Sequence, residues 1–218
     1  MGFRGASHRG GSIEATGWGG RAMDSSSWGR DYSRREFLIV SLGTAGMALV
    51  VSEARAAPAC GVDGAVTPPQ TEGPYFKPSS PARASLIEPG ISGTKLVIEG
   101  SVLTTDCKPV RGALLDFWQA DADGHYDNSG NRLRGHQLTD DSGHYRLETI
   151  VPARYPGRTR HIHVKVQAPG RPALTTQLYF PGEPGNQRDG IFDPKLVMKV
   201  RDVEGGKVGT FDFVLRGG

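Results

Sequence analysis

The chain has 218 residues, a length that suits one domain with extra segments better than two full domains. Its 31 glycines and 15 prolines are scattered among short apolar runs, which disfavours long helices and favours short strands joined by turns. Seven of the 26 Lys and Arg and five of the 23 Asp and Glu lie in residues 1–56. Residues 57–218 therefore contain 19 basic and 18 acidic residues. Since no concentrated basic surface follows from this balance, we expect no nucleic-acid partner.

The N-terminal segment, residues 1–56, has the pattern of a targeting signal rather than of a folded domain. The pair Arg34-Arg35 stands directly before an apolar run from Phe37 to Val51, and Ala54-Arg55-Ala56 offers small residues for cleavage. This pattern is typical of a twin-arginine signal peptide and predicts export to the periplasm or the extracellular space. Because the run is too short for a stable spanning helix, we expect no permanent membrane span after processing. An uncleaved anchor and a chance basic-apolar segment are the alternatives.

The two cysteines of the chain, Cys60 and Cys107, both lie beyond the predicted signal. Export would bring them into an oxidising compartment, where disulfides form and persist. The sequence therefore favours a Cys60–Cys107 disulfide that ties the new N-terminus to the rest of the protein. Two unrelated free thiols are the alternative.

Residues 57–218 contain the strand candidates. A Pro-rich stretch from Pro68 to Phe76 predicts extended chain. Short segments rich in β-branched or aromatic residues follow, and most are bounded by Gly, Pro, Asp or Asn. They are Lys95–Leu103, Ala113–Ala120, Tyr145–Ile150, His161–Val166, Thr175–Phe180, Val197–Val203 and Val208–Leu215. We predict a single all-β sandwich of seven or eight strands, immunoglobulin- or prealbumin-like, with long loops that carry a metal site.

Two histidines and two tyrosines form the candidate metal site. His161 and His163 stand at positions i and i+2, so on a strand their imidazoles share one face and can approach the same ion. Such a pair alone is more often packed or exposed. Tyr155 lies six residues before His161, and Tyr126 lies in an earlier loop. A phenolate is a hard anionic donor that suits Fe(III) better than Zn(II) or Cu(I), so this set favours Fe(3+) without haem.

Five motifs between Pro69 and Pro181 resemble the intradiol ring-cleavage dioxygenases, the family that includes protocatechuate 3,4-dioxygenase and the catechol 1,2-dioxygenases. The motifs, in chain order, are TEGPYF from Thr71, FWQADADGHY from Phe117, RGHQLTD from Arg134, RTRHIH from Arg158 and QLYF from Gln177. The segment from Cys60 to Tyr75 and the twin-arginine signal are most similar to an exported subgroup.

This resemblance implies that iron is held by Tyr126, Tyr155, His161 and His163. It implies that Tyr126 and His161 are the equatorial ligands and that Tyr155 and His163 are the axial ones. Tyr155 matches the tyrosinate that leaves the metal when substrate binds, and it can then accept a substrate proton. A catalytic role for Tyr155 follows from the resemblance.

The resemblance also implies two catalytic residues beside the metal. Arg158 matches the arginine that stabilises negative charge on the activated substrate, although the short six-residue step from Tyr155 to His161 leaves Arg160 as an alternative. Gln177 matches a hydrogen-bonding glutamine. Tyr75 is a candidate for the substrate-binding wall, with a packing or turn role as the equal alternative.

The activity that the resemblance implies is cleavage of a small aromatic diol by O2 between the two hydroxyl-bearing carbons, with both oxygen atoms incorporated and a muconate-type diacid as product. One alternative is a secreted β-sandwich module that binds carbohydrate or protein without catalysis. Another is a secreted protein that uses the two histidines for Cu(II) or Zn(II). The sequence leaves open which catechol is bound and which oligomeric state the protein has, a homo-oligomer included.

Overall fold

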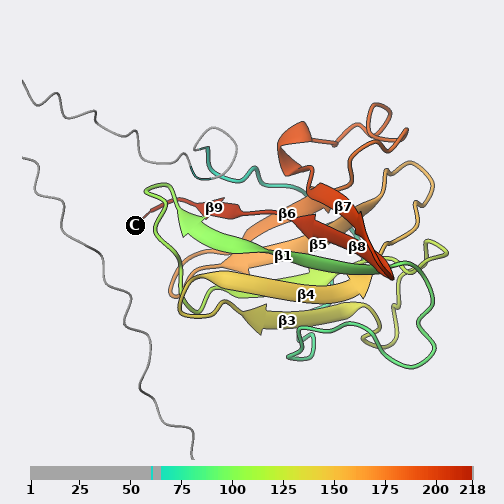
Figure 1. Cartoon of the computed structure of the whole chain (residues 1–218), viewed down its shortest axis with the longest axis horizontal. Helices are drawn as coiled ribbons and strands as arrows, with labels where there is room; N and C mark the ends of the chain where they lie inside the picture. Colours follow the sequence, from blue (N-terminus) through green and yellow to red (C-terminus); the bar gives the residue numbers. More distant parts are fainter. Residues whose placement is uncertain (1–59, 61–64, 218) are drawn as a thin grey trace, which may run out of the picture. The chain divides into compact units, whose positions relative to one another are not determined.

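The computed structural model describes residues 60 and 65–217 (Figure 1), so the predicted signal peptide and its cleavage site lie outside the described residues. These residues form nine strands and one short 3-10 helix, η1. The bounds are β1 Lys95–Thr104, β2 Leu114–Trp118, β3 Arg134–Leu138, β4 His144–Ile150, β5 His161–Gln167, β6 Leu174–Tyr179, η1 Pro194–Leu196, β7 Lys199–Val203, β8 Gly206–Thr210 and β9 Phe213–Leu215. No helix in this part of the chain has the length and apolar character needed to cross a membrane.

The prediction of an all-β fold is confirmed, but the strand count is higher than expected. The segment Arg134–Leu138, which contains a single large apolar residue, forms β3 by pairing with β2 along its whole length. The expected strand Val208–Leu215 is divided into β8 and β9, which pair in parallel with different parts of β1. The division occurs beside Gly100 of β1, where an added Cβ would lie 1.8 Å from the Phe211 carbonyl oxygen.

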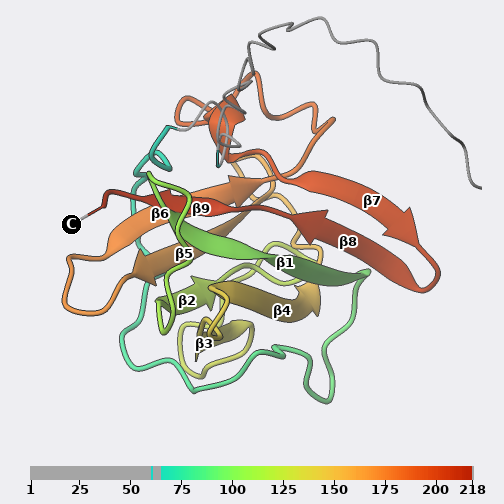
Figure 2. The same cartoon turned by 60° about the vertical axis from the view of Figure 1, so that its left-hand side comes forward.

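The strands form two sheets that enclose the core. One sheet has the order β4-β1-β8-β7, with β9 alongside β1, and the other has the order β3-β2-β5-β6. Figure 2 shows β1, β8 and β7 on one side and β2, β5 and β6 on the other. Fully buried residues from both sheets meet between them, among them Ile98 and Leu147 from the first sheet and Phe117, Ile162 and Val164 from the second. Burial of this apolar surface is the main stabilising contribution to the sandwich.

The alternation of residues along β5 separates the core from the candidate site. Ile162, Val164 and Val166 belong to the hydrophobic core. Because successive side chains of a strand point to opposite faces, His161 and His163 lie on the outer face of the sheet β3-β2-β5-β6. Both histidines are nevertheless buried, at 3% and 1% exposure. The outer face must therefore be covered by another part of the chain.

That cover is the N-terminal strap, which we define as residues 65–82. The Gln70 backbone N–H donates to the Thr175 carbonyl at 2.8 Å, and Lys165 of β5 pairs with Glu72 of the strap at 2.5 Å. Farther along, Ala82 forms an isolated parallel bridge with His136 of β3. The strap thus crosses the outer face from β6 to β3, and Figure 2 shows it outside this sheet.

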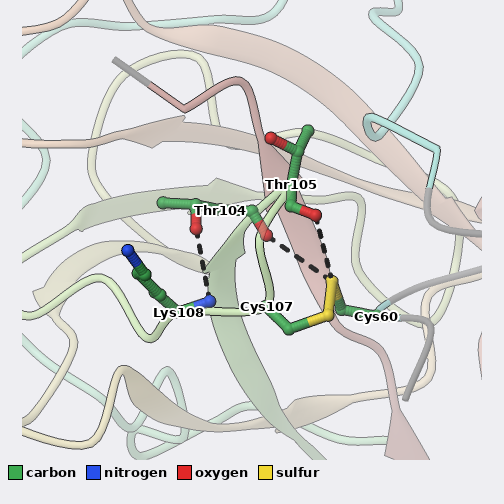
Figure 3. The surroundings of a disulfide bond; sticks show 5 residues. All are labelled: Cys60, Thr104, Thr105, Cys107 and Lys108. Atoms are coloured by element: carbon green, nitrogen blue, oxygen red, sulfur yellow. Dashed lines mark hydrogen bonds between the residues drawn. A yellow bond between two sulfur atoms is a disulfide. The ribbon is translucent and has the colours of Figure 1, made fainter. Parts of the chain in front are cut away.

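A disulfide joins Cys60 to Cys107, the pair that the sequence favoured (Figure 3). Their Cα atoms lie 5.3 Å apart, within the usual range for such a bond. Cys107 lies in the turn that follows β1, where its backbone N–H donates to the Thr104 carbonyl at 2.9 Å. The bond therefore fastens the chain just before the strap to the sandwich.

Candidate metal centre and substrate cleft

The register of the outer sheet places several candidate residues in one cross-strand row. Arg134 of β3 is opposite Trp118 of β2, Trp118 is opposite His163 of β5, and His163 is opposite Gln177 of β6. Directly paired residues project from the same face of a sheet, so these four side chains lie side by side beneath the strap. The rings of Trp118 and His163 stack with centroids 4.8 Å apart and planes 8° apart.

The two histidines present ring nitrogens to each other. His161 Nδ1 lies 2.7 Å from the Thr159 carbonyl oxygen. Because a carbonyl only accepts, Nδ1 carries the hydrogen, and the lone pair of the neutral ring is on Nε2. That Nε2 lies 3.1 Å from His163 Nε2 and 3.4 Å from Tyr155 Oη. Burial, together with the charge of Arg158, lowers the pKa of His161 to about 4, so the ring is neutral at physiological pH.

The tyrosines approach the same place from two loops. Tyr126 lies in the loop between β2 and β3, and Tyr155 lies in the loop between β4 and β5. The ring centroid of Tyr126 is 5.8 Å from that of Tyr155 and 6.2 Å from that of His163. Tyr126 Oη is buried and has no hydrogen-bond partner among the described residues. Burial, with a further contribution from Tyr155, raises the pKa of Tyr126 well above its usual value.

These observations fit a bound cation. Two neutral imidazole nitrogens face each other, and a buried phenol oxygen beside them lacks a partner. A cation at this place would satisfy all three atoms, and it would favour the phenolate that burial alone disfavours. Within the described part of the chain, no group of three or more His, Cys, Asp or Glu could hold a metal. A site of hard phenolate oxygens together with imidazole suits ferric iron.

Arg158 is held beside the two histidines by three side chains. Its Nε donates to Asp189 Oδ2 at 2.9 Å, and its Nη2 donates to Gln177 Oε1 at 2.5 Å and to Tyr179 Oη at 3.5 Å. Gln177 in turn donates to the Thr71 carbonyl of the strap at 3.0 Å. The guanidinium is therefore fixed within the same group of side chains as the candidate metal ligands.

Arg160, the alternative to Arg158, has different neighbours. Its Nε lies 3.1 Å from Glu183 Oε1, and its guanidinium lies 5.9 Å from the ring centroid of Phe180. Arg158 therefore hydrogen-bonds to Gln177, whereas the contacts of Arg160 are with Glu183 and Phe180.

A cleft of about 580 Å³ opens beside Tyr155 and Arg158. Its walls are the loop 153–160 and residues near Asp189. Gly157 lies in this loop with φ +80°, and a Cβ built there would meet no atom within 4 Å. The cleft is therefore open at Gly157. A second cavity of about 320 Å³ lies beside Cys60 and contains none of the candidate site residues.

Tyr75 lies against both tyrosines of the site. Its ring stacks on Tyr126 with centroids 4.3 Å apart and planes 13° apart, and it meets Tyr155 edge-on at 6.1 Å. The strap therefore contributes an aromatic wall to the site.

Two residues that contact the site were not identified from the sequence. Trp118 stacks on His163. Because side chains alternate along Leu114–Trp118 and Phe117 is in the core, the sequence could have shown that Trp118 points to the outer face. Asp189 holds Arg158 from 31 residues away in the sequence. No local pattern marks an acid at that distance.

The comparisons with known proteins agree with this geometry. A family model described as Dioxygenase matches residues 71–217. A 6-chlorohydroxyquinol 1,2-dioxygenase of Cupriavidus pinatubonensis is 28% identical over 85% of this chain and 75% of its own length. A chlorocatechol 1,2-dioxygenase of Pseudomonas sp. is 32% identical over 67% of this chain and 69% of its own length.

Solved structures give the same result. One is the dioxygenase domain of a dioxygenase and carbohydrate-binding protein fusion from the cellulolytic bacterium Streptomyces sp. SirexAA-E; it is 60% identical, with a TM-score of 0.69, and the match covers 70% of this chain and 99% of that domain. Another is the 3-chlorocatechol 1,2-dioxygenase of Rhodococcus opacus, which is 29% identical, with a TM-score of 0.66, over 69% of this chain and 72% of that one. The chain therefore belongs to the intradiol ring-cleavage dioxygenases, oxidoreductases that open catechol-type rings between the two hydroxyl-bearing carbons.

Proposed function

We propose that the protein is a non-haem Fe(III) dioxygenase that converts a small aromatic diol and O2 to a muconate-type diacid. The observation that carries this proposal is the convergence of Tyr126, Tyr155, His161 and His163 on one place beneath the strap. These four residues would hold the iron. Ferric iron supplies, when bound, the Lewis acidity and the withdrawal of electron density that make the ring of a deprotonated diol reactive toward O2.

The protein's contribution at the diol is proton acceptance and charge stabilisation. Burial raises the pKa of Tyr155 above its usual value, so the Tyr155 phenolate would be a strong proton acceptor for a substrate hydroxyl beside it. Arg158 is fixed by Asp189 and Gln177 before substrate arrives. A preorganised cation of this kind stabilises negative charge that develops on the substrate, at no cost of reorganisation.

The other residues position ligands and exclude water. The Thr159 carbonyl fixes the His161 tautomer that exposes the Nε2 lone pair. His163 Nδ1 has no hydrogen-bond partner among the described residues, so stacking against Trp118 fixes that ring instead. Tyr75 covers Tyr126. The cleft at Tyr155, Gly157 and Arg158 gives the diol access from solvent.

Oxygen uptake with a substrate panel tests this function. Iron-loaded protein should consume O2 with at least one of catechol, protocatechuate and hydroxyquinol, and the product should be the diacid formed by cleavage between the hydroxyl-bearing carbons. Cleavage beside the hydroxyls, which gives a semialdehyde, or no O2 uptake with any diol would contradict the proposal. Wild-type protein without iron is the control.

We also propose that the protein acts outside the cytoplasm after twin-arginine export. The Arg34-Arg35 pair and the apolar run behind it support this. The Cys60–Cys107 disulfide supports it independently, because such bonds persist in oxidising compartments.

A further inference from the structure

The stacked pair Tyr75 and Tyr126 joins two segments that are far apart in the sequence. Tyr75 belongs to the strap and Tyr126 to the loop between β2 and β3, yet their rings lie 4.3 Å apart and nearly parallel. Within the described residues, the Tyr126 hydroxyl makes no hydrogen bond that could fix its ring. The two rings are positioned by their packing against each other and against Tyr155, and by the backbones that carry them.

Arg134 of β3 binds both of these backbones. Its Nη1 donates to the Tyr75 carbonyl at 2.8 Å, and its Nη2 and Nε donate to the Asp127 carbonyl at 2.9 and 3.2 Å. The residue is 2% exposed, and no ion pair of Arg134 occurs in the described part of the chain. A buried guanidinium without a carboxylate partner is costly unless hydrogen bonds compensate for its lost hydration. All three side-chain hydrogen bonds of Arg134 go to the two segments that carry Tyr75 and Tyr126.

The loop that presents the Asp127 carbonyl is closed by its own side chain. One oxygen of the Asp127 carboxylate accepts the backbone N–H groups of Ser129 and Gly130 at 3.0 and 2.6 Å, and the other accepts that of Arg132 at 2.9 Å. The Asp127 carboxylate thus accepts hydrogen bonds from within the loop, whereas the backbone carbonyl of Asp127 accepts those of Arg134. A rigid loop and a planar guanidinium together define where the neighbouring Tyr126 lies.

We propose that Arg134 is a positioning residue for the metal centre, because it holds the strap at Tyr75 and the loop at Asp127, next to Tyr126, in a fixed relation. This inference rests on the proposed metal centre for its consequence in catalysis, but the clamp itself is a property of the chain alone. Lysine cannot replace arginine here, since a compact ammonium lacks the fork that reaches two carbonyls on separate segments.

The test compares Arg134→Lys with Arg83→Lys. Arg83 is the control because its guanidinium also donates to backbone carbonyls nearby, those of Arg134 and Asn131. It pairs with Glu88 and contacts neither Tyr75 nor Asp127. Hydrogen–deuterium exchange on the iron-free proteins is the first readout. In Arg134→Lys, residues 73–77 and 124–130 should lose protection together, whereas Arg83→Lys should retain protection in both segments.

Iron-loaded proteins give the second readout. Arg134→Lys should keep iron but show a shifted visible band and a loss of about 100-fold in kcat/KM, the scale expected for a misplacement of about 1 Å. Arg83→Lys should keep the wild-type band. If Arg134→Lys is only less thermostable, with exchange and band unchanged, Arg134 is a structural residue and the proposal is wrong.

Asp127→Ala provides an independent test should Arg134→Lys not fold. It removes the closure of the loop but leaves the guanidinium in place. If the clamp exists, exchange should rise in residues 73–77 of the strap as well as in the loop. Faster exchange confined to the loop would overturn the proposal. Because the exchange experiments use iron-free protein, they do not depend on whether the proposed reaction is correct.

Discussion

At the scale of single residues, the site is organised by hydrogen bonds that leave defined atoms available. The Thr159 carbonyl occupies His161 Nδ1, so Nε2 is the nitrogen that remains for a metal. Asp189 occupies Arg158 Nε, so Nη2 is directed to Gln177. The two tyrosine oxygens are less constrained, and Tyr126 Oη has no partner in the described part of the chain. Substituting one of these tyrosines therefore allows its effect on metal binding and its effect on proton transfer to be measured separately.

Tyr155→Phe should retain weaker iron binding, because Tyr126, His161 and His163 remain. It should shift the visible band, since one phenolate donor is lost. Ring cleavage should fall by about 100- to 10,000-fold, the usual contribution of a positioned proton acceptor. Visible spectra, iron analysis and O2 uptake on the same preparation measure these effects. Unchanged spectrum and activity would show that Tyr155 does not contact the metal.

Arg158→Lys should lower kcat by roughly 100- to 1,000-fold, as loss of a single preorganised donor does elsewhere, because lysine cannot bind Asp189 and Gln177 at once. Arg160→Lys is the matched control, since it keeps a cation beside Glu183. Its kcat should stay within a few-fold of wild type. Steady-state kinetics with one diol would decide between the two arginines, and equal losses would contradict the assignment.

Sequence motifs marked the candidate ligands but not the residues that hold them. His161 and His163 were recognisable because a strand repeats every two residues, which places both on one face. Trp118 and Arg134 act through the strand register, which pairs each with a residue far along the chain. Asp189 reaches Arg158 from a loop without any periodic pattern. Such long-range partners require the three-dimensional structure.

At the scale of elements, the strap makes the outer face of the sheet β3-β2-β5-β6 a buried site. The sequence predicted an extended segment from Pro68 to Phe76, and the strap contains it. It could not predict β3, because Arg134–Leu138 has neither alternating apolar residues nor β-branched ones. That strand exists because β2 pairs with it on one side and the strap binds it at His136.

The Cys60–Cys107 disulfide should stabilise the fold more than it supports catalysis. The bond closes a loop with a sequence separation of 47 residues. The chain-entropy model gives about 4 kcal/mol for a loop of this size. Between Cys60 and Tyr75, Thr67 bonds to Val214 and Gln70 to Thr175, so the strap keeps separate attachments to the sandwich.

We therefore expect Cys107→Ser to unfold at a lower denaturant concentration and to retain activity within a few-fold. Cys60→Ser and the double variant should match it, because each removes the same bond. Equilibrium unfolding and O2 uptake measure the two effects. A non-reduced digest of exported protein that yields two free thiols would contradict the bond itself.

At the scale of the whole molecule, the sequence predicts two parts with separate roles. Residues 71–217 match the family model and contain every proposed catalytic and metal-binding residue. The predicted division into an extension with a signal at residues 1–56 and a sandwich at residues 57–218 stays a prediction, since the extension lies outside the described residues. The sequence could predict the fold class and the family, because the motifs and the strand spacing are local patterns.

Replacing both Arg34 and Arg35 with Lys should stop export, because the twin-arginine system reads the guanidinium pair as an address. Full-length precursor should then remain in the cytoplasm, with folded and active dioxygenase. Cell fractionation measures where the protein is found, and its mass shows whether the signal has been cleaved. Normal export and processing of the double variant would show that a different signal operates.

The most direct test of the central claim is the anaerobic visible spectrum of the iron-loaded protein, titrated with catechol and paired with iron analysis. We expect one ferric iron per chain and a phenolate-to-iron absorption band that changes when catechol is added. Tyr126→Phe should alter the spectrum of the catechol complex more than Tyr155→Phe does, because Tyr126 is expected to stay bound. Iron-loaded protein without such a band, or a band that catechol leaves unchanged, would contradict the proposed tyrosine and histidine centre.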